Sequence, residues 1–119
     1  MNRRATGSRF EASAAKFLEE QGCQIIARNY RSGHHEIDLI CLKDEVVIFV
    51  EVKGSRSEKF GDAVYKVDQR KQQSLIAAAQ GFIQQFRRKV AGFRFDVVIV
   101  TEAPDGRQRI EHRPNAFTL

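Results

Sequence analysis

The sequence predicts an α/β domain in which helices flank a central mixed β-sheet. Two stretches carry apolar residues at helical spacing, and three short apolar runs follow one another between residues 23 and 53. A further β-branched apolar run, residues 93–100, comes after the second helical stretch. The length of 119 residues suits one domain spanning 1–119.

The first helix is predicted to begin at Ser8, because Ser8 and Glu11 have the S-x-x-E spacing of a capping box. Gly22 is expected to end this helix. The apolar positions that recur at helical spacing are Phe10, Ala14, Phe17 and Leu18.

Three strands are expected next, at residues 23–30, 35–42 and 45–53. The breaks between them are short, so we expect neighbouring strands to pair antiparallel. Residues 44 and 45, an Asp-Glu pair, form the break between the second strand and the third.

The polar residues 54–66 are predicted to form a mobile loop. Asp68 is expected to cap a long second helix that ends at Gly92. This helix is long enough to make the strand at 93–100 parallel to a neighbour. A weaker edge strand is expected at 108–113, which completes the order α-β-β-β-α-β-β.

Composition favours a polyanionic partner and a cytoplasmic location. Twenty Lys and Arg against fifteen Asp and Glu give a net charge of +5. No apolar run approaches the roughly 20 residues that a membrane helix needs, so no membrane association is expected. The first residues lack the apolar stretch of a secretory signal. Cys23 and Cys41 have no zinc-site spacing and are expected to be small buried thiols.

The hairpin of the second and third strands carries an unusual group of charges. With a two-residue turn at 44–45, opposed residues have numbers that sum to 89. Asp38 then lies opposite Glu51, and Glu36 lies opposite Lys53, all on one face. A slip of one residue would send Asp38 and Glu51 to opposite faces. The other face is predicted to carry Ile37, Leu39 and Cys41.

Opposed carboxylates repel, at a cost of up to about 1 kcal/mol, and a divalent cation removes that repulsion. Mg²⁺ or Mn²⁺ suits Asp38 and Glu51 as ligands, with the backbone carbonyl of Val52 as a further one. Lys53 would then hold an attacking water or neutralise a phosphate, which is the chemistry of metal-assisted phosphodiester hydrolysis. The alternative is a surface ladder of salt bridges, with Glu36 paired to Lys53, and these residues alone leave both interpretations open.

Three segments, RNYRSGHHEIDLI, VIFVEVKGSRS and FRFDVVIV, resemble the YraN-like family of small uncharacterised proteins. The resemblance extends over nearly the whole chain. That family resembles the restriction-endonuclease-like superfamily, close to archaeal Holliday-junction resolvases. The resemblance implies a restriction-endonuclease-like fold, a divalent-metal site and endonuclease chemistry on DNA.

Position by position, the resemblance implies that Asp38 is the metal-binding Asp and that Glu51 and Lys53 form the ExK pair. Glu11 corresponds to the acid that resolvase-like members carry on their first helix, although a capping box with Ser8 explains it equally well. Glu36 belongs to the EID triplet of the family. His35 stands where the family usually has Gly, and its side chain would either crowd the site or add a phosphate contact.

Several cations are candidates for contacts with DNA phosphates, which give affinity without reading base sequence. Each of them alone is more often solvated surface charge, and the interest lies in the set beside an acidic site. The candidates are Arg28, Arg31, Arg56, Lys59, Lys66 and Lys71. His34 and His35 alternate along a strand and so are expected not to share a metal shell. Asp96, in a buried strand, is expected to pair with an arginine.

The leading hypothesis is a Mg²⁺- or Mn²⁺-dependent DNA endonuclease, acting on branched structures. The first alternative is a non-catalytic nucleic-acid-binding module of a DNA repair or uptake complex. The second is an α/β adaptor whose hairpin charges only pair with one another. A homodimer stays open, because junction enzymes cut two strands symmetrically.

Overall fold

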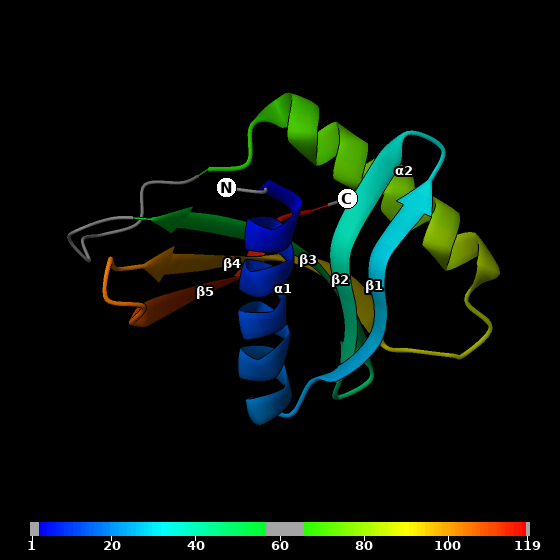
Figure 1. Ribbon diagram of the computed structural model, residues 1–119. Coiled ribbons are helices and arrows are strands. Elements are labelled where there is room, and N and C mark those ends of the chain that lie inside the picture. Colours follow the sequence, from blue (N-terminus) through cyan, green and yellow to red (C-terminus); the bar gives the residue numbers. More distant parts are fainter. Residues whose placement is uncertain (1–2, 57–65, 119) are drawn as a thin grey trace.

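The computed structural model describes residues 3–56 and 66–118. Its elements follow the predicted order α-β-β-β-α-β-β (Figure 1). The helices are α1 (Arg3–Glu20) and α2 (Gln69–Gln85), and the strands are β1 (Gln24–Ser32), β2 (His35–Lys43), β3 (Val46–Arg56), β4 (Gly92–Glu102) and β5 (Gln108–Phe117). The strands form one sheet in the order β1-β2-β3-β4-β5, in which only the β3–β4 pair is parallel. The predicted α/β class with a mixed sheet is therefore confirmed.

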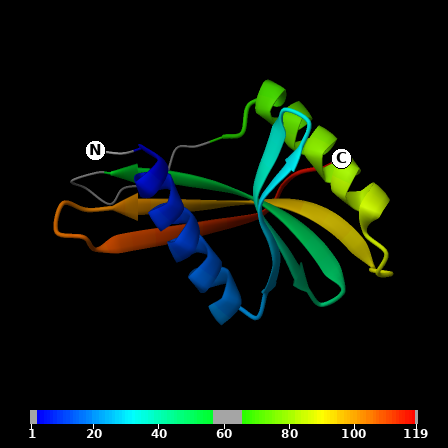
Figure 2. The same cartoon turned by 45° about the vertical axis from the view of Figure 1, so that its right-hand side comes forward.

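The two helices cover opposite faces of the sheet (Figures 1 and 2). On one face, α1 packs Phe10, Ala14 and Leu18 against Leu39, Cys41, Ile48, Val50 and Val98. On the other, α2 packs Leu75, Ala78 and Ala79 against Ile40, Phe49, Phe95 and Val97. Each strand therefore has apolar side chains on both faces, as the run at 93–100 predicted.

Gly54 of β3 lets α1 lie directly on the sheet backbone. A Cβ at this position would overlap the ring of Phe10, which is buried. The contact fixes where the first half of α1 sits above β3. It thereby fixes Glu11, the residue that follows Phe10.

The predicted start of the first helix is wrong. α1 begins at Arg3, five residues before Ser8, so Ser8 is an exposed residue inside the helix. A capping box needs an N-cap with non-helical backbone. That explanation of Glu11 therefore does not apply, and Glu11 lies in the third turn of the helix with its side chain half-buried.

The predicted hairpin register is confirmed. Five pairs of β2 and β3, from Leu39 with Val50 to Lys43 with Val46, have residue numbers that sum to 89. Asp44 and Glu45 form the turn with φ of 49° and 65°. Left-handed backbone at both positions defines a type I′ turn, whose twist matches that of the strands although Asn-Gly is its usual sequence.

Pairing between β2 and β3 stops at Leu39 and Val50, whereas β2 stays paired with β1 as far as His35. The β1–β2 hairpin therefore bends away from β3, which continues beside β4 (Figures 1 and 2). Ile37 was expected on the same face as Leu39, but it packs in the cluster covered by α2. The bend explains this, because strict alternation of faces holds only while the strand stays in the sheet.

Two predictions for the segment around the second helix need correction, and one is confirmed. Gly54, Ser55 and Arg56 belong to β3, because its parallel pairing with β4 continues to Glu102. Asp68 caps α2 as predicted, its carboxylate accepting a hydrogen bond from the Lys71 amide at 2.8 Å. The helix ends at Gln85, and Gly92 instead begins β4. Lys59 and residues 57–65 of the expected loop lie outside the described residues.

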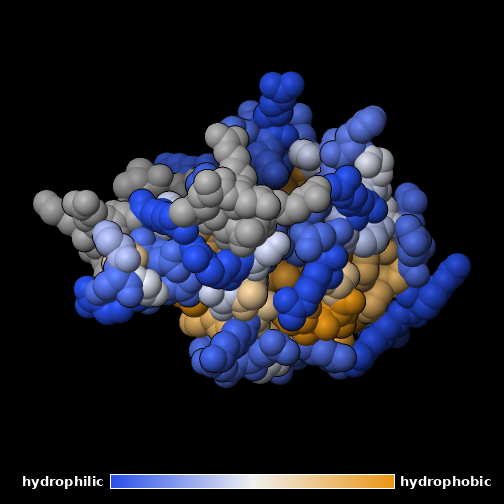
Figure 3. Space-filling view, viewed as in Figure 1, coloured by the Kyte–Doolittle hydropathy of each residue, from blue (hydrophilic) through white to orange (hydrophobic). Residues whose placement is uncertain are grey.

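Charged and polar side chains cover most of the face shown in Figure 3, and an apolar area lies beside them over the β1–β2 hairpin. Ile25, Ile26 and Ala27 of β1 are the partly buried apolar residues of this edge strand. Neither described helix combines the length and the apolar character needed to cross a membrane.

Candidate functional site: a carboxylate cluster where two strands diverge

Asp38 and Glu51 lie just past the last paired residues of β2 and β3, where the two strands separate. The backbone N–H of Val52 donates a hydrogen bond to Asp38 Oδ2 at 2.8 Å. A side-chain oxygen thus takes the place of the backbone acceptor that the departing strand no longer offers. The Asp38 carboxyl is close enough to that of Glu51 to raise the pKa of Glu51. The two acids are therefore neighbours, as predicted, although the ladder ends at Leu39 and Val50 and pairs neither Asp38 with Glu51 nor Glu36 with Lys53.

Glu51 is buried, with 9% of its surface exposed, on the face that α2 covers. Burial and then the neighbouring Asp38 raise the pKa of Glu51 to about 8. Lys71, on the first turn of α2, partly offsets this, with Nζ 3.3 Å from Glu51 Oε2. Oε2 is nevertheless a buried oxygen that accepts no hydrogen bond of good geometry from the described residues. A buried acceptor in this condition is rare, and it is costly without a ligand.

Two more acids stand close by. Burial, followed by the charge of Asp38, raises the pKa of Glu11, and Glu36 adds to the effect. Asn29 of β1 lies between Glu11 and Glu36. With its amide nitrogen turned toward the carboxylates, it donates to Glu36 Oε1 and to Glu11 Oε2, both at 3.1 Å. Asp38 of β2 thus lies close enough to raise the pKa of both Glu11 on α1 and Glu51 on β3.

Asn29 was not among the residues singled out from the sequence. It has a left-handed backbone with φ of 51°, which Asn tolerates better than most residues. Asn is also uncommon within strands. The signal in the sequence was therefore a strand-breaking residue inside an otherwise regular strand.

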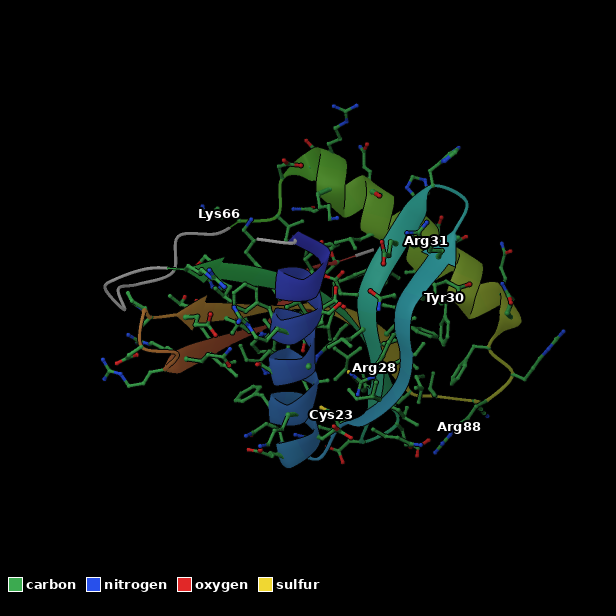
Figure 4. All side chains as sticks on the ribbon, in the orientation of Figure 1. Cys23, Arg28, Tyr30, Arg31, Lys66 and Arg88 are labelled. Carbon is green, nitrogen blue, oxygen red and sulfur yellow. The ribbon has the colours of Figure 1, made fainter. Side chains whose placement is uncertain are left out.

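The cations predicted to contact DNA fall into two groups. Arg28 of β1 is exposed and lies on the hairpin beside α1 (Figure 4). Its charge lowers the pKa of Glu11. Arg31 is exposed near the tip of that hairpin, 3.9 Å from Glu36. Together with Lys71, these two residues border the carboxylate cluster.

The remaining cations lie farther along the sheet. Arg56 sits 3.7 Å from the buried Glu102, which also binds Arg9 at 2.6 Å. Lys66 is exposed where the chain enters α2 (Figure 4). Lys53 is exposed, and alternation along β3 puts it on the same face as Glu51. The ammonium of Lys71 lies 3.3 Å from Glu51 Oε2, and the spacing of residues along the strands gave no sign of this ion pair.

The other expectations concern residues outside the cluster. His35 Nδ1 lies 2.8 Å from Ser74 Oγ and links β2 to α2, whereas His34 is exposed. Asp96 pairs with Arg94, as expected, at 2.9 and 3.1 Å. Cys23 and Cys41 are both buried free thiols, which confirms the prediction for them.

The donor set fits a hard divalent cation. Among the described residues, no three Asp, Glu, His or Cys side chains are grouped tightly enough to enclose a metal. Mg²⁺, however, commonly takes only one or two carboxylates and keeps several waters. Asp38 and Glu51 offer that number, and the unsatisfied Glu51 Oε2 is the kind of oxygen such an ion would complete. The role given to the Val52 carbonyl stays a prediction.

The architecture, a five-stranded mixed sheet with helices on both faces, is that of the restriction-endonuclease-like fold class. The chain belongs to a family that a comparison of sequences identifies. Residues 10–100 match the Uncharacterised protein family UPF0102, the family of YraN-like proteins.

Full-length relatives support that membership. A UPF0102 protein of Chloroherpeton thalassium is 46% identical over 96 residues, covering 81% of this chain and 74% of the relative. One of Sulfurihydrogenibium sp. is 39% identical over 119 residues, covering 100% of this chain and 99% of the relative. A third, of Symbiobacterium thermophilum, is 41% identical over 114 residues, covering 96% and 97%.

Proposed function

We propose that this protein is a metal-dependent DNA endonuclease that hydrolyses phosphodiester bonds, with a preference for branched DNA. The observation that carries the proposal is the proximity of the Asp38 and Glu51 carboxyls. Glu51 Oε2 is buried, has no hydrogen bond among the described residues, and lies 3.3 Å from Lys71 Nζ. A buried carboxyl oxygen without a hydrogen bond is costly in a fold that only needs stability. A titratable group with so large a pKa shift, next to a specific charged partner, is typical of a functional site.

Each residue of the cluster has a separate role in the proposed reaction. Asp38 and Glu51 would hold Mg²⁺ or Mn²⁺, and the Val52 N–H keeps the Asp38 carboxylate oriented. The ion, when bound, supplies a polarised phosphate and a more acidic attacking water. Lys71 holds positive charge at the edge of the cluster, where it would balance the charge that develops on the phosphate.

Other groups would help to bind and orient the substrate. Glu11 and Glu36, held by Asn29, would accept hydrogen bonds from water on the metal. Arg28 and Arg31 at the rim would contact DNA phosphates. A homodimer would present two such sites to a branched substrate, and a DNA substrate implies a cytoplasmic location.

One observation favours a second candidate, a non-catalytic DNA-binding module. Lys71 already lies 3.3 Å from Glu51 Oε2, and it partly neutralises the acid without any metal. A protein that kept the fold and the basic rim for binding alone would show the same pair.

Cleavage assays separate the two candidates. The purified protein is incubated with linear, flapped and four-way DNA in Mg²⁺ or Mn²⁺. We expect cleavage in the wild type and none in Asp38→Asn, which keeps an acceptor for the Val52 N–H but loses the charge. Asp105→Asn, an exposed acid far from the cluster, is the matched control and should cleave normally. Salt-sensitive binding without cleavage would favour the binding module.

A further inference from the structure

We propose that a cavity next to the carboxylate cluster binds one unpaired nucleotide of the DNA strand whose adjoining phosphate lies at the cluster. The cavity has a volume of about 260 Å³. Its described lining residues are Lys66, Val67, Gln72, Val97, Arg113 and Ala116. The inference rests on the proposed function in one respect, that DNA is the substrate.

The cavity and the cluster share a wall. Val97 of β4 is the direct partner of Glu51 on β3, and neighbouring strands lie about 4.8 Å apart. Gln72 of α2 follows Lys71, the residue whose ammonium stands beside Glu51. A strand with one phosphate at the cluster therefore has an adjoining nucleotide within reach of the cavity.

An irregularity in β5 shapes the opposite wall. Phe95 pairs with Phe117 and Val97 with Arg113, so one residue of β4 faces three residues of β5 between these pairs. In a regular strand, Arg113 and Ala116 would point to opposite faces because they are three positions apart. Here both line the cavity. Bulges of this kind often occur beside functional sites, where they redirect side chains.

The bulge is held in place from the other face of the sheet. Asn115 has a left-handed backbone with φ of 53°, and its N–H donates to Asp96 Oδ1 at 2.9 Å. The side chain of Asp96 is fully buried and is also bound by Arg94 and His112. A buried network of hydrogen bonds therefore holds the backbone of the bulge beside the cavity.

The lining combines the two features that a nucleotide requires. Lys66 and Arg113 supply positive charge for a phosphate, and Arg113 is oriented by Glu111, whose Oε2 lies 3.0 Å from its Nε. Val67, Val97 and Ala116 supply an apolar surface for the faces of a base. The volume suits one base rather than a duplex. Because extruding a paired base costs a few kcal/mol, such a cavity favours DNA in which a nucleotide is already unpaired.

The test measures DNA affinity without metal, in EDTA, by the fluorescence anisotropy of labelled flapped and fully paired DNA. Ala116→Trp fills the cavity, and Arg113→Gln removes its charge without adding bulk. Arg109→Gln, on the same strand but outside the cavity, is the matched control. Thermal melts of all variants verify folding.

We expect the wild type to bind the flap about tenfold more tightly than the duplex, since one base contact is worth about 1–3 kcal/mol. Both cavity variants should bring this ratio close to one, and Arg109→Gln should leave it unchanged. Equal binding of flap and duplex by the wild type, or an unchanged ratio in both cavity variants, overturns the inference. The inference is also overturned if a free mononucleotide competes for binding as strongly as the flapped DNA does. That result would indicate a site for small nucleotides.

The two proposals fail separately. If metal-dependent cleavage occurs on flap and duplex alike while the affinity ratio is one, the endonuclease stands and the nucleotide cavity does not. If cleavage is absent while the ratio behaves as expected, the cavity stands and the catalytic proposal does not.

Discussion

Glu51 and Asp96 are both acids buried in the middle of the sheet, on opposite faces, and their surroundings differ sharply. Burial alone would raise the pKa of Asp96, but hydrogen bonds from His112, Arg94 and the Asn115 amide outweigh it and lower the pKa. Glu51 faces another carboxyl, keeps an unsatisfied oxygen, and has its pKa raised to about 8. The comparison separates an acid whose hydrogen bonds the fold satisfies from one that it leaves partly unsatisfied, which is the feature on which the proposed metal site rests.

Removal of Asp96 should have the largest effect on stability. Asp96→Ala leaves Arg94 and His112 without their buried partner and releases the Asn115 amide. Breaking a buried pair in this way costs about 3–5 kcal/mol of unfolding free energy. Urea denaturation measures it.

Asp105→Ala is the control for that measurement, because Asp105 pairs with Arg107 at the exposed β4–β5 turn. We expect this change to cost less than about 1 kcal/mol. A similar loss in both variants would show that the network around Asp96 adds nothing beyond a surface ion pair.

The pH dependence of the metal-free protein should reveal Glu51. Its pKa is raised from the ordinary 4.5 to about 8 on folding, so between those values the native state holds a proton that the unfolded chain lacks. Stability contributed by this proton is fully present below pH 4.5 and is lost as the pH rises toward 8. We expect a fall of ~1–3 kcal/mol across this range.

Glu51→Gln is the matched variant for that titration, since glutamine keeps the shape of the protonated acid and does not ionise. Its unfolding free energy should vary less over the same range and exceed that of the wild type at pH 8. Parallel pH profiles for the two proteins would mean that Glu51 keeps an ordinary pKa.

Asn29 should have a smaller effect, on metal affinity rather than on folding. Asn29→Gly keeps the left-handed backbone, which glycine adopts readily, and removes the amide between Glu11 and Glu36. Loss of such an orienting contact typically weakens metal binding tenfold or more, and we expect about tenfold for Mn²⁺. Asn115→Gly makes the same change at another left-handed position, with φ of 53°. Equal weakening in both would assign the effect to the backbone.

The sequence predicted the features that depend on local alternation. The order of elements along the chain and the pairing of Leu39 with Val50 followed from the spacing of apolar residues and a two-residue turn. The bend of the β1–β2 hairpin away from β3 could not be predicted this way. It depends on which neighbour β2 stays paired with, and the α2 packing that moves Ile37 to the other face is a contact between distant segments.

The site was predicted in the same uneven way. Asp38 and Glu51 came from strand parity, but Lys71 approaches Glu51 only because α2 docks on that face, 20 residues further along the chain. The role of Asn29 became visible only from its left-handed backbone conformation, which the sequence does not show. The helix start was missed because Ser8 imitates an N-cap although the helix already begins at Arg3.

The measurement that tests the central claim most directly is a calorimetric titration of metal-free protein with Mn²⁺. The wild type should bind with release of a proton near pH 7, because a ligand with a pKa of about 8 must ionise. Asp38→Asn and Glu51→Gln should each lose the binding heat, and Asp105→Asn should keep it. If Mn²⁺ binds Glu51→Gln as tightly as the wild type, with the same proton release, Asp38 and Glu51 do not hold a metal together.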